Sequence, residues 1–136
     1  MARTIVPELC KSNPYYISKH RYYELKHFCL QYPEWKREIK ELRANSIRTG
    51  SLIFRTGETS HVDMVSENAI RIFSLGEKMQ KVDLAIKQLD DWIQPYIFAA
   101  VTEGYSFTYL KTVMNIPCER DTYYDRYRRF FYILSV

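Results

Sequence analysis

The chain is 136 residues long, 46% hydrophobic and 26% charged, with a formal net charge of +4 at pH 7. This length and composition predict one globular domain, and the mild charge argues against a histone-like binder of nucleic acid. Three cysteines, an odd number with no CxxC pair, argue against both a disulfide framework and a structural zinc site.

The chain is predicted to begin with an irregular arm over residues 1–17. This arm contains the turn-forming pair Asn13-Pro14, and it lacks an apolar run of the length that a signal peptide needs. No later stretch approaches the length needed to cross a membrane. We therefore expect a cytoplasmic protein without a membrane partner.

A pair of helices is predicted over residues 18–44. Ser18 can cap the first helix, and Pro33 fits the first turn of the second. Apolar residues recur every three or four positions in both helices, as Trp35 and Ile39 do in the second. Each helix therefore has an apolar face that needs a partner.

The first of these helices also interleaves cations with tyrosines. Its cationic side chains define what we call the secondary basic surface: Lys19, Arg21 and Lys26. Such a surface can follow a phosphate backbone or stack on bases. An amphipathic helix with half of its tyrosines in the core explains the same pattern, and we favour this plainer interpretation.

Residues 45–60 are predicted to form a loop. Gly50 and Gly57 bracket the sequence SLIFRT, which is compatible with a short strand or a hairpin inside the loop. A structureless connection of this length is uncommon in a compact domain, so we expect the loop to be mobile or functional.

The strongest structural signal is a long helix predicted over residues 61–93. Apolar residues alternate spacings of three and four along it, as in a heptad seam. The seam comprises Val65, Asn68, Ile72, Leu75, Met79, Val82, Ile86, Leu89 and Ile93. Either the seam packs on the helices of 18–44, which we favour because they need an apolar partner, or it forms a homodimer through residues 65–93. In the dimer, Asn68 would set the register.

The region 95–134 has the layout of a helix-turn-helix. Three helical pieces are predicted: 95–104, 107–114 and 119–134. A tight turn at 115–117 would join the last two, with Ile116 filling the gap between them. The spacing on the last helix predicts a core stripe of Tyr124, Tyr127, Phe131 and Leu134. The sequence thus predicts an all-α fold, a helical bundle with a long central helix and a C-terminal helix-turn-helix.

The last helix is the candidate recognition helix. The candidate DNA contacts are one lysine of the preceding helix and residues off the core stripe: Lys111, Arg120, Thr122, Tyr123, Arg126, Arg128 and Arg129. Arg120 is placed for a bidentate contact to guanine, and Thr122 and Tyr123 for base or phosphate contacts. The remaining arginines would meet phosphates. An amphipathic helix whose arginines pair with Asp121 and Asp125 explains the pattern equally well.

No catalytic grouping stands out in the sequence. His20, His27 and His61 have no metal-ligand spacing with acids or cysteines. The sequence contains no GxxxxGK(S/T) phosphate loop, no GxSxG nucleophile elbow and no HExxH zinc motif. We therefore expect a protein that is not an enzyme and that has no metal and no cofactor.

Three stretches in order resemble the small phage transcription regulators of the RinA and ArpU type. They are YYELKHFCLQYPEWKREIKELR, AIRIFSLGEKMQKVDLAIKQLDDWI and FTYLKTVMNIPCERDTYYDRYRRFFYIL. In that family the C-terminal part is similar to region four of bacterial sigma factors. The resemblance implies a phage or prophage regulator that binds promoter DNA in the cytoplasm of a bacterial host, with host RNA polymerase as a further candidate partner.

A second hypothesis belongs to a different class. The chain would be a phage protein-interaction module or inhibitor that binds a host protein or a nucleoprotein complex without catalysis. It would use the tyrosine-rich surface and the loop of residues 45–60. The modest net charge favours this hypothesis, whereas the helical layout favours DNA binding.

Overall fold

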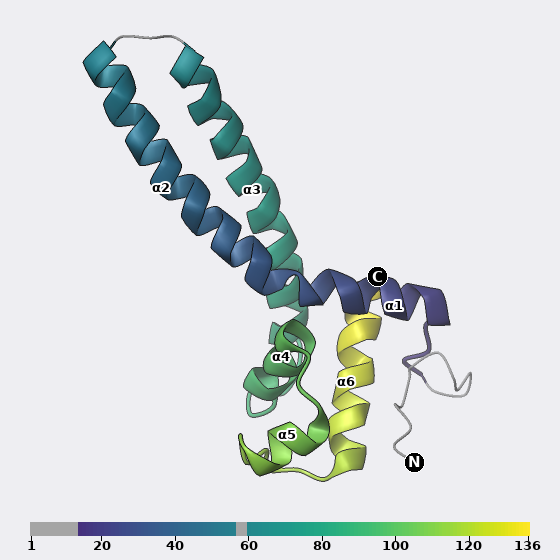
Figure 1. Cartoon of the computed structure of the whole chain (residues 1–136). Helices are drawn as coiled ribbons and strands as arrows, with labels where there is room; N and C mark the ends of the chain where they lie inside the picture. The colour runs from purple at the N-terminus through teal and green to yellow at the C-terminus, as the bar shows by residue number, and fades with distance from the viewer. Residues whose placement is uncertain (1–13, 57–59) are drawn as a thin grey trace. The chain divides into compact units, whose positions relative to one another are not determined.

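The computed structural model describes residues 14–56 and 60–136 (Figure 1). Over these ranges the chain forms six α-helices: α1 (Lys19–Leu30), α2 (Tyr32–Thr56), α3 (Ser60–Lys87), α4 (Gln94–Glu103), α5 (Phe107–Thr112) and α6 (Arg120–Ser135). The prediction of an all-α fold is confirmed. Residues 1–13, which make up most of the predicted arm, lie outside the described residues.

The helices divide into two compact units. The first unit holds the described parts of Met1–Gln31 and Lys81–Val136, and the second holds those of Tyr32–Gln80. Helix α3 begins in the second unit and ends in the first. The residues that the sequence assigned to one helical domain, 18–134, are therefore distributed over two units.

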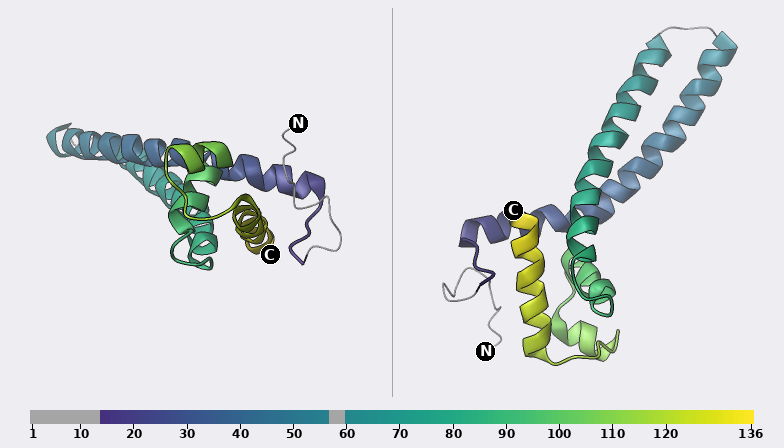
Figure 2. Two further views of the ribbon diagram at one scale, coloured as in Figure 1. Left: turned by 90° about the horizontal axis from the view of Figure 1, so that it is seen from below. Right: turned by 180° about the vertical axis from the view of Figure 1, so that it is seen from behind.

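The second unit is a hairpin of α2 and the first part of α3, which run antiparallel (Figures 1 and 2). Glu38 and Arg71 join the two helices, because Nε and Nη2 of Arg71 donate to the two carboxylate oxygens of Glu38 at 3.2 and 3.3 Å. The Lys78 ammonium also lies 5.8 Å from the centre of the Trp35 ring. Trp35 and Ile39 are buried on α2, as is Leu75 on α3.

The predicted loop of residues 45–60 is wrong over residues 45–56, which continue α2 without a strand or hairpin. A glycine inside a helix costs only about 1 kcal/mol relative to alanine, so Gly50 alone does not end a helix. The segment 45–56 also contains no proline, the residue that would break a helix. Residues 57–59 lie outside the described residues.

Burial along α3 and the turn after it follows the predicted heptad seam. Within this single chain Leu75, Val82, Ile86, Leu89 and Ile93 are all buried. Intramolecular packing therefore covers this part of the seam, and the choice between packing on residues 18–44 and a homodimer through residues 65–93 stays a prediction.

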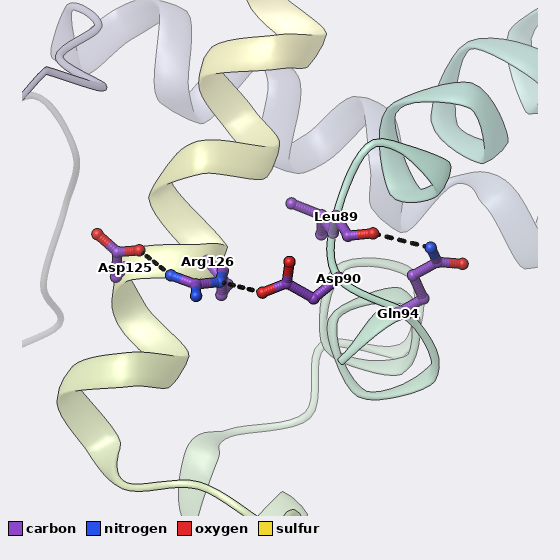
Figure 3. A network of polar contacts seen from close by, with 5 residues as sticks. All are labelled: Leu89, Asp90, Gln94, Asp125 and Arg126. Carbon is purple, nitrogen blue, oxygen red and sulfur yellow. Dashed lines mark hydrogen bonds and ion pairs between the residues drawn. The ribbon is translucent and has the colours of Figure 1, made fainter. Parts of the chain in front are cut away.

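Helix α3 ends at Lys87 and not at 93, because residues 88–93 form a turn. The amide of Gln94 caps this end, since its Nε2 donates to the carbonyl oxygen of Leu89 at 2.9 Å (Figure 3). The same nitrogen donates to the carbonyl oxygen of Lys87 at 3.5 Å. Carbonyl groups in the last turn of a helix lack partners within the helix, so the capping amide stabilises the end. The chain then enters α4, which has Pro95 in its first turn.

In the first unit, α1 and α4 both pack against α6, and α4 also packs against α1 and α5. The core includes Leu25, Cys29, Ile97, Leu110 and Phe130, all of them buried. Figure 1 shows the C-terminal end of α6 beside α1.

Side-chain caps begin two of these helices, and the cap at Ser18 is the predicted one. The hydroxyl of Ser18 accepts from the backbone N–H of Arg21 at 3.3 Å, and that of Ser106 from the N–H of Tyr109 at 3.2 Å. Helix α4 ends at Gly104, whose φ of 76° lies in the left-handed region where glycine is favoured.

Candidate nucleic-acid interface

The connection between α5 and α6 is held by a buried side chain. Asn115 adopts a left-handed φ of 55°, and the N–H of Ile116 donates to the carbonyl oxygen of Leu110 at 3.0 Å. Ile116 is 1% exposed and fills the gap between the helices, as predicted. The connection spans residues 113–119, which is longer than the three or four residues of a helix-turn-helix turn.

Burial on α6 differs from the predicted core stripe by a small rotation of the helix. Tyr123, Phe130 and Phe131 are buried, whereas the predicted core residues Tyr124 and Leu134 are half-buried. Tyr123 is only 2% exposed, and its ring centre lies 5.3 Å from that of Phe107. Tyr123 is therefore a core residue, and we remove it from the candidate DNA contacts.

Arg126 is engaged within the protein. Its Nε donates to Asp90 Oδ2 at 2.8 Å, and its Nη1 donates to the carboxylate of Asp125 (Figure 3). The hydrogen bond to Asp90 and that to Asp125 raise the pKa of the guanidinium, although partial burial acts in the opposite direction. Arg126 thus joins α6 to the turn after α3 and is not presented to a phosphate.

Two cations are exposed where α5 and α6 meet, and we call them the α5–α6 cation pair: Lys111 and Arg120. The ammonium of Lys111 donates to the carbonyl oxygen of Cys118 at 3.4 Å. The guanidinium of Arg120 lies 5.4 Å from the centre of the Phe107 ring, a cation–π arrangement that limits its freedom. Thr122, the predicted DNA contact two residues after Arg120, is half-buried.

Arg128 and Arg129 lie farther along α6, about 12 Å from Arg120 at 1.5 Å per residue. Both are half-buried. The structure therefore places the ammonium of Lys111 beside Cys118, two residues before Arg120, and the other two arginines at least two turns beyond Arg120.

The secondary basic surface on α1 is only partly free. Arg21 forms an ion pair with Glu24 at 2.5 Å, and its Nη2 donates to the carbonyl oxygen of Ser135 at 3.4 Å. Lys19 is exposed. Lys26 is half-buried, with its ammonium 6.0 Å from the centre of the Tyr23 ring.

A pocket of about 240 Å³ lies between α1, α4, α5 and α6 in the first unit. Aromatic rings dominate its wall, and Lys26 contributes its charge. We call this the aromatic pocket, and its rings belong to Tyr22, Tyr105, Phe107, Tyr123, Tyr124, Tyr127 and Phe131. The sequence analysis noted tyrosines beside cations on both α1 and α6, but the pocket exists only because the fold brings these helices together.

The described residues contain no cluster of three histidine, cysteine or acidic side chains that could hold a metal ion. Cys29 is buried in the core, and burial raises the pKa of its thiol to about 12. Among the helices that the structure describes, none combines the length and apolar character of a membrane span.

Comparison with known proteins identifies no relative of this chain. No protein-family model, no curated protein and no solved structure matches the chain. The resemblance to regulators of the RinA and ArpU type therefore stays a prediction from the sequence.

Proposed function

We propose that the chain is a DNA-binding regulatory protein that presents the α5–α6 cation pair to duplex DNA. Arg120 would enter the major groove, and Lys111 would meet a phosphate. The resemblance to RinA-type and ArpU-type regulators supports the narrower assignment to control of phage or prophage genes. Host RNA polymerase stays a candidate second partner.

One observation carries this proposal: Arg120 is exposed in the first turn of α6, and α6 is anchored by buried side chains next to it. Tyr123 lies one turn along the helix, and Ile116 holds the connection that precedes it. Arginine at the start of a recognition helix is the residue type that most often reads guanine in the major groove. The rigid support lowers the entropy lost on binding.

Acidic side chains beside Arg120 should reduce the electrostatic attraction between the cation pair and DNA. The acidic side chains Glu119 and Asp121 are exposed on either side of Arg120. Their repulsion of phosphates offsets part of the attraction of the cation pair. We therefore expect a shallow salt dependence, with a slope of about one to three released counterions instead of the about ten that a strongly basic repressor shows.

The test is selection of a binding site from randomised duplex DNA, followed by titration at several salt concentrations. Arg120→Ala should weaken binding to the selected site by about 1–3 kcal/mol and relax preference at one base position. Arg43→Ala removes the same charge from the exposed face of α2 and should leave affinity unchanged. Absence of binding to any duplex at low salt would overturn the proposal.

A second candidate function, binding of a partner protein, is favoured by a separate observation on the α2–α3 hairpin. Ile70 and Phe73 are 70% and 69% exposed, and a spacing of three places them on one face of α3. Large apolar side chains exposed together are typical of a protein-binding surface.

This candidate is tested by retention of purified bacterial RNA polymerase on the immobilised chain without DNA. Phe73→Ser should abolish retention, whereas Leu84→Ser, which changes another exposed apolar residue of α3, should not. Equal retention by both variants would count against the hairpin as the binding surface.

A further inference from the structure

The wall of the aromatic pocket is built from rings at varied inclinations. The centres of Tyr123 and Tyr124 are 4.9 Å apart with the rings edge-to-face, and those of Tyr124 and Tyr127 are 6.1 Å apart in the same arrangement. Phe107 is tilted against Tyr124, at 6.5 Å. Such a wall favours a flat aromatic ligand, because rings gain from stacked and edge-to-face contacts.

The volume of the pocket limits the size of this ligand. About 240 Å³ is below the roughly 300–1,000 Å³ of sites for drug-sized molecules. The pocket therefore has room for one planar ring system with a small substituent, and not for an extended chain.

The charge of the pocket determines whether a bound ligand should carry a positive or a negative substituent. Lys26 is charged, and no acidic side chain lies among the described residues of the lining. A cationic ligand, such as the methylated ammonium groups that aromatic cages bind, would be repelled by Lys26. An anionic substituent would be attracted, and an ammonium is a common partner of phosphate.

Hydroxyl groups give the wall a polar component. The phenol oxygens of Tyr22 and Tyr127 are 2.7 Å apart and share a hydrogen bond. Burial raises the pKa of the Tyr127 phenol, so the group stays protonated at neutral pH. Phenol groups both donate and accept hydrogen bonds, as the edge of a nucleobase requires.

We propose that the aromatic pocket binds one nucleobase, with the phosphate of that nucleotide on Lys26. Stacking on aromatic side chains is the usual way in which proteins hold an unpaired base. The nucleotide has two sources, a free mononucleotide or an unpaired position of a DNA strand. This site goes beyond the proposed binding of duplex DNA, which leaves every base paired.

The experiment follows the fluorescence of 2-aminopurine, which stacking quenches, in four probes. These are the deoxynucleoside 5′-monophosphate, the nucleoside without phosphate, a single-stranded oligonucleotide with one 2-aminopurine, and the blunt duplex with that base paired. Lys26→Met removes the charge and keeps the aliphatic stem. Lys40→Met makes the same change on the exposed face of α2 and is the matched control.

We expect the monophosphate to bind about tenfold more tightly than the nucleoside, the gain that one charge-assisted hydrogen bond supplies. Lys26→Met should remove this difference, and Lys40→Met should preserve it. Tighter binding of the single strand than of the monophosphate identifies an unpaired position as the source, and the reverse order identifies the free nucleotide.

Three results would overturn the inference. They are the absence of quenching at millimolar monophosphate, equal affinities in wild type and Lys26→Met, and binding of uncharged indole as tight as that of the monophosphate. The last result would assign the pocket to an aromatic side chain of a protein partner. Binding of the blunt duplex is measured separately, so the proposed function can hold when this inference fails.

Discussion

The guanidinium of Arg126 lies 2.8 Å from the carboxylate of Asp90, although 36 positions separate the two residues in the chain (Figure 3). The bond ties the middle of α6 to the turn between α3 and α4. It therefore holds the candidate recognition helix in place within the first unit. The predictions that follow begin with this bond.

Replacing Arg126 with methionine should lower the free energy of unfolding by about 1 kcal/mol, because both side chains are partly exposed and solvent weakens their attraction. The measurement is urea denaturation of Arg126→Met, Asp90→Asn and the double variant. We expect a coupling energy of about 0.5–1 kcal/mol between the two positions. Strictly additive effects would show that the bond contributes nothing to stability.

Truncation of Ile116 should be costly, because its side chain is buried between α5 and α6. Ile116→Ala should lower the free energy of unfolding by about 2–4 kcal/mol through lost burial and a new cavity. Val113→Ala, in the same connection, is the control, since Val113 is 57% exposed and should cost less than about 0.5 kcal/mol. Thermal denaturation of both variants compares them directly, and similar losses would refute the assignment of Ile116 to the core.

Alanine at two glycines should change stability in opposite directions. Gly104 has a φ of 76°, so Gly104→Ala should cost about 1 kcal/mol through backbone strain. Gly76 is inside α3, and an added Cβ would meet no atom within 4 Å, so Gly76→Ala should stabilise by about 0.5–1 kcal/mol. Chemical denaturation of both variants tests this, and a destabilising Gly76→Ala would mean that α3 is not helical there.

The free energy of unfolding should fall in alkaline solution, because the buried thiol of Cys29 keeps its proton in the folded chain where the unfolded chain loses it. Burial raises the pKa of the Cys29 thiol from 9.0 to about 12 in the folded chain. Below about pH 9 the thiol is protonated in both the folded and the unfolded chain. Between about pH 9 and 12 only the unfolded chain releases the proton, so the free energy of unfolding falls, by at most about 1.4 kcal/mol per pH unit for one group.

Urea denaturation from pH 8 to 11 measures this fall. Cys29→Ala should be less stable than the wild type at neutral pH, because it leaves a cavity, and its stability should fall less steeply above pH 9. Burial also raises the pKa of Tyr127, so part of the slope should persist in the variant. Identical slopes in both proteins would show that Cys29 does not contribute.

Local sequence signals determined several of the helix boundaries in the first unit. Ser18 caps α1 as predicted, Ser106 caps α5 and Gly104 ends α4, because caps and left-handed positions depend on residues within one turn. The same reasoning failed at residues 45–56. There Gly50 and Gly57 led to the prediction of a loop over residues 45–60, although one glycine costs little compared with the propagation of a helix that is already formed.

The orientation of α6 could not be decided from spacing. Two sets of aromatic residues recur at helical intervals on this helix. One is Tyr123, Tyr127 and Phe130, and the other is Tyr124, Tyr127 and Phe131, so the spacing offers two possible core faces. In the folded chain Tyr123 and Phe130 are buried together with Phe131, whereas Tyr124 is only half-buried, and the ring of Tyr123 lies against that of Phe107 on α5. The sequence therefore placed a core residue among the candidate DNA contacts.

For this protein the sequence by itself determined the all-α class and the position of Arg120 at the start of the last helix. It did so because helical periodicity, capping and chain punctuation act over a few residues. Only the tertiary structure decided that Arg126 pairs with Asp90 and that Lys26 joins the rings of α5 and α6 in one pocket. Those contacts join residues far apart in the chain, and only the packing of the helices brings them within reach.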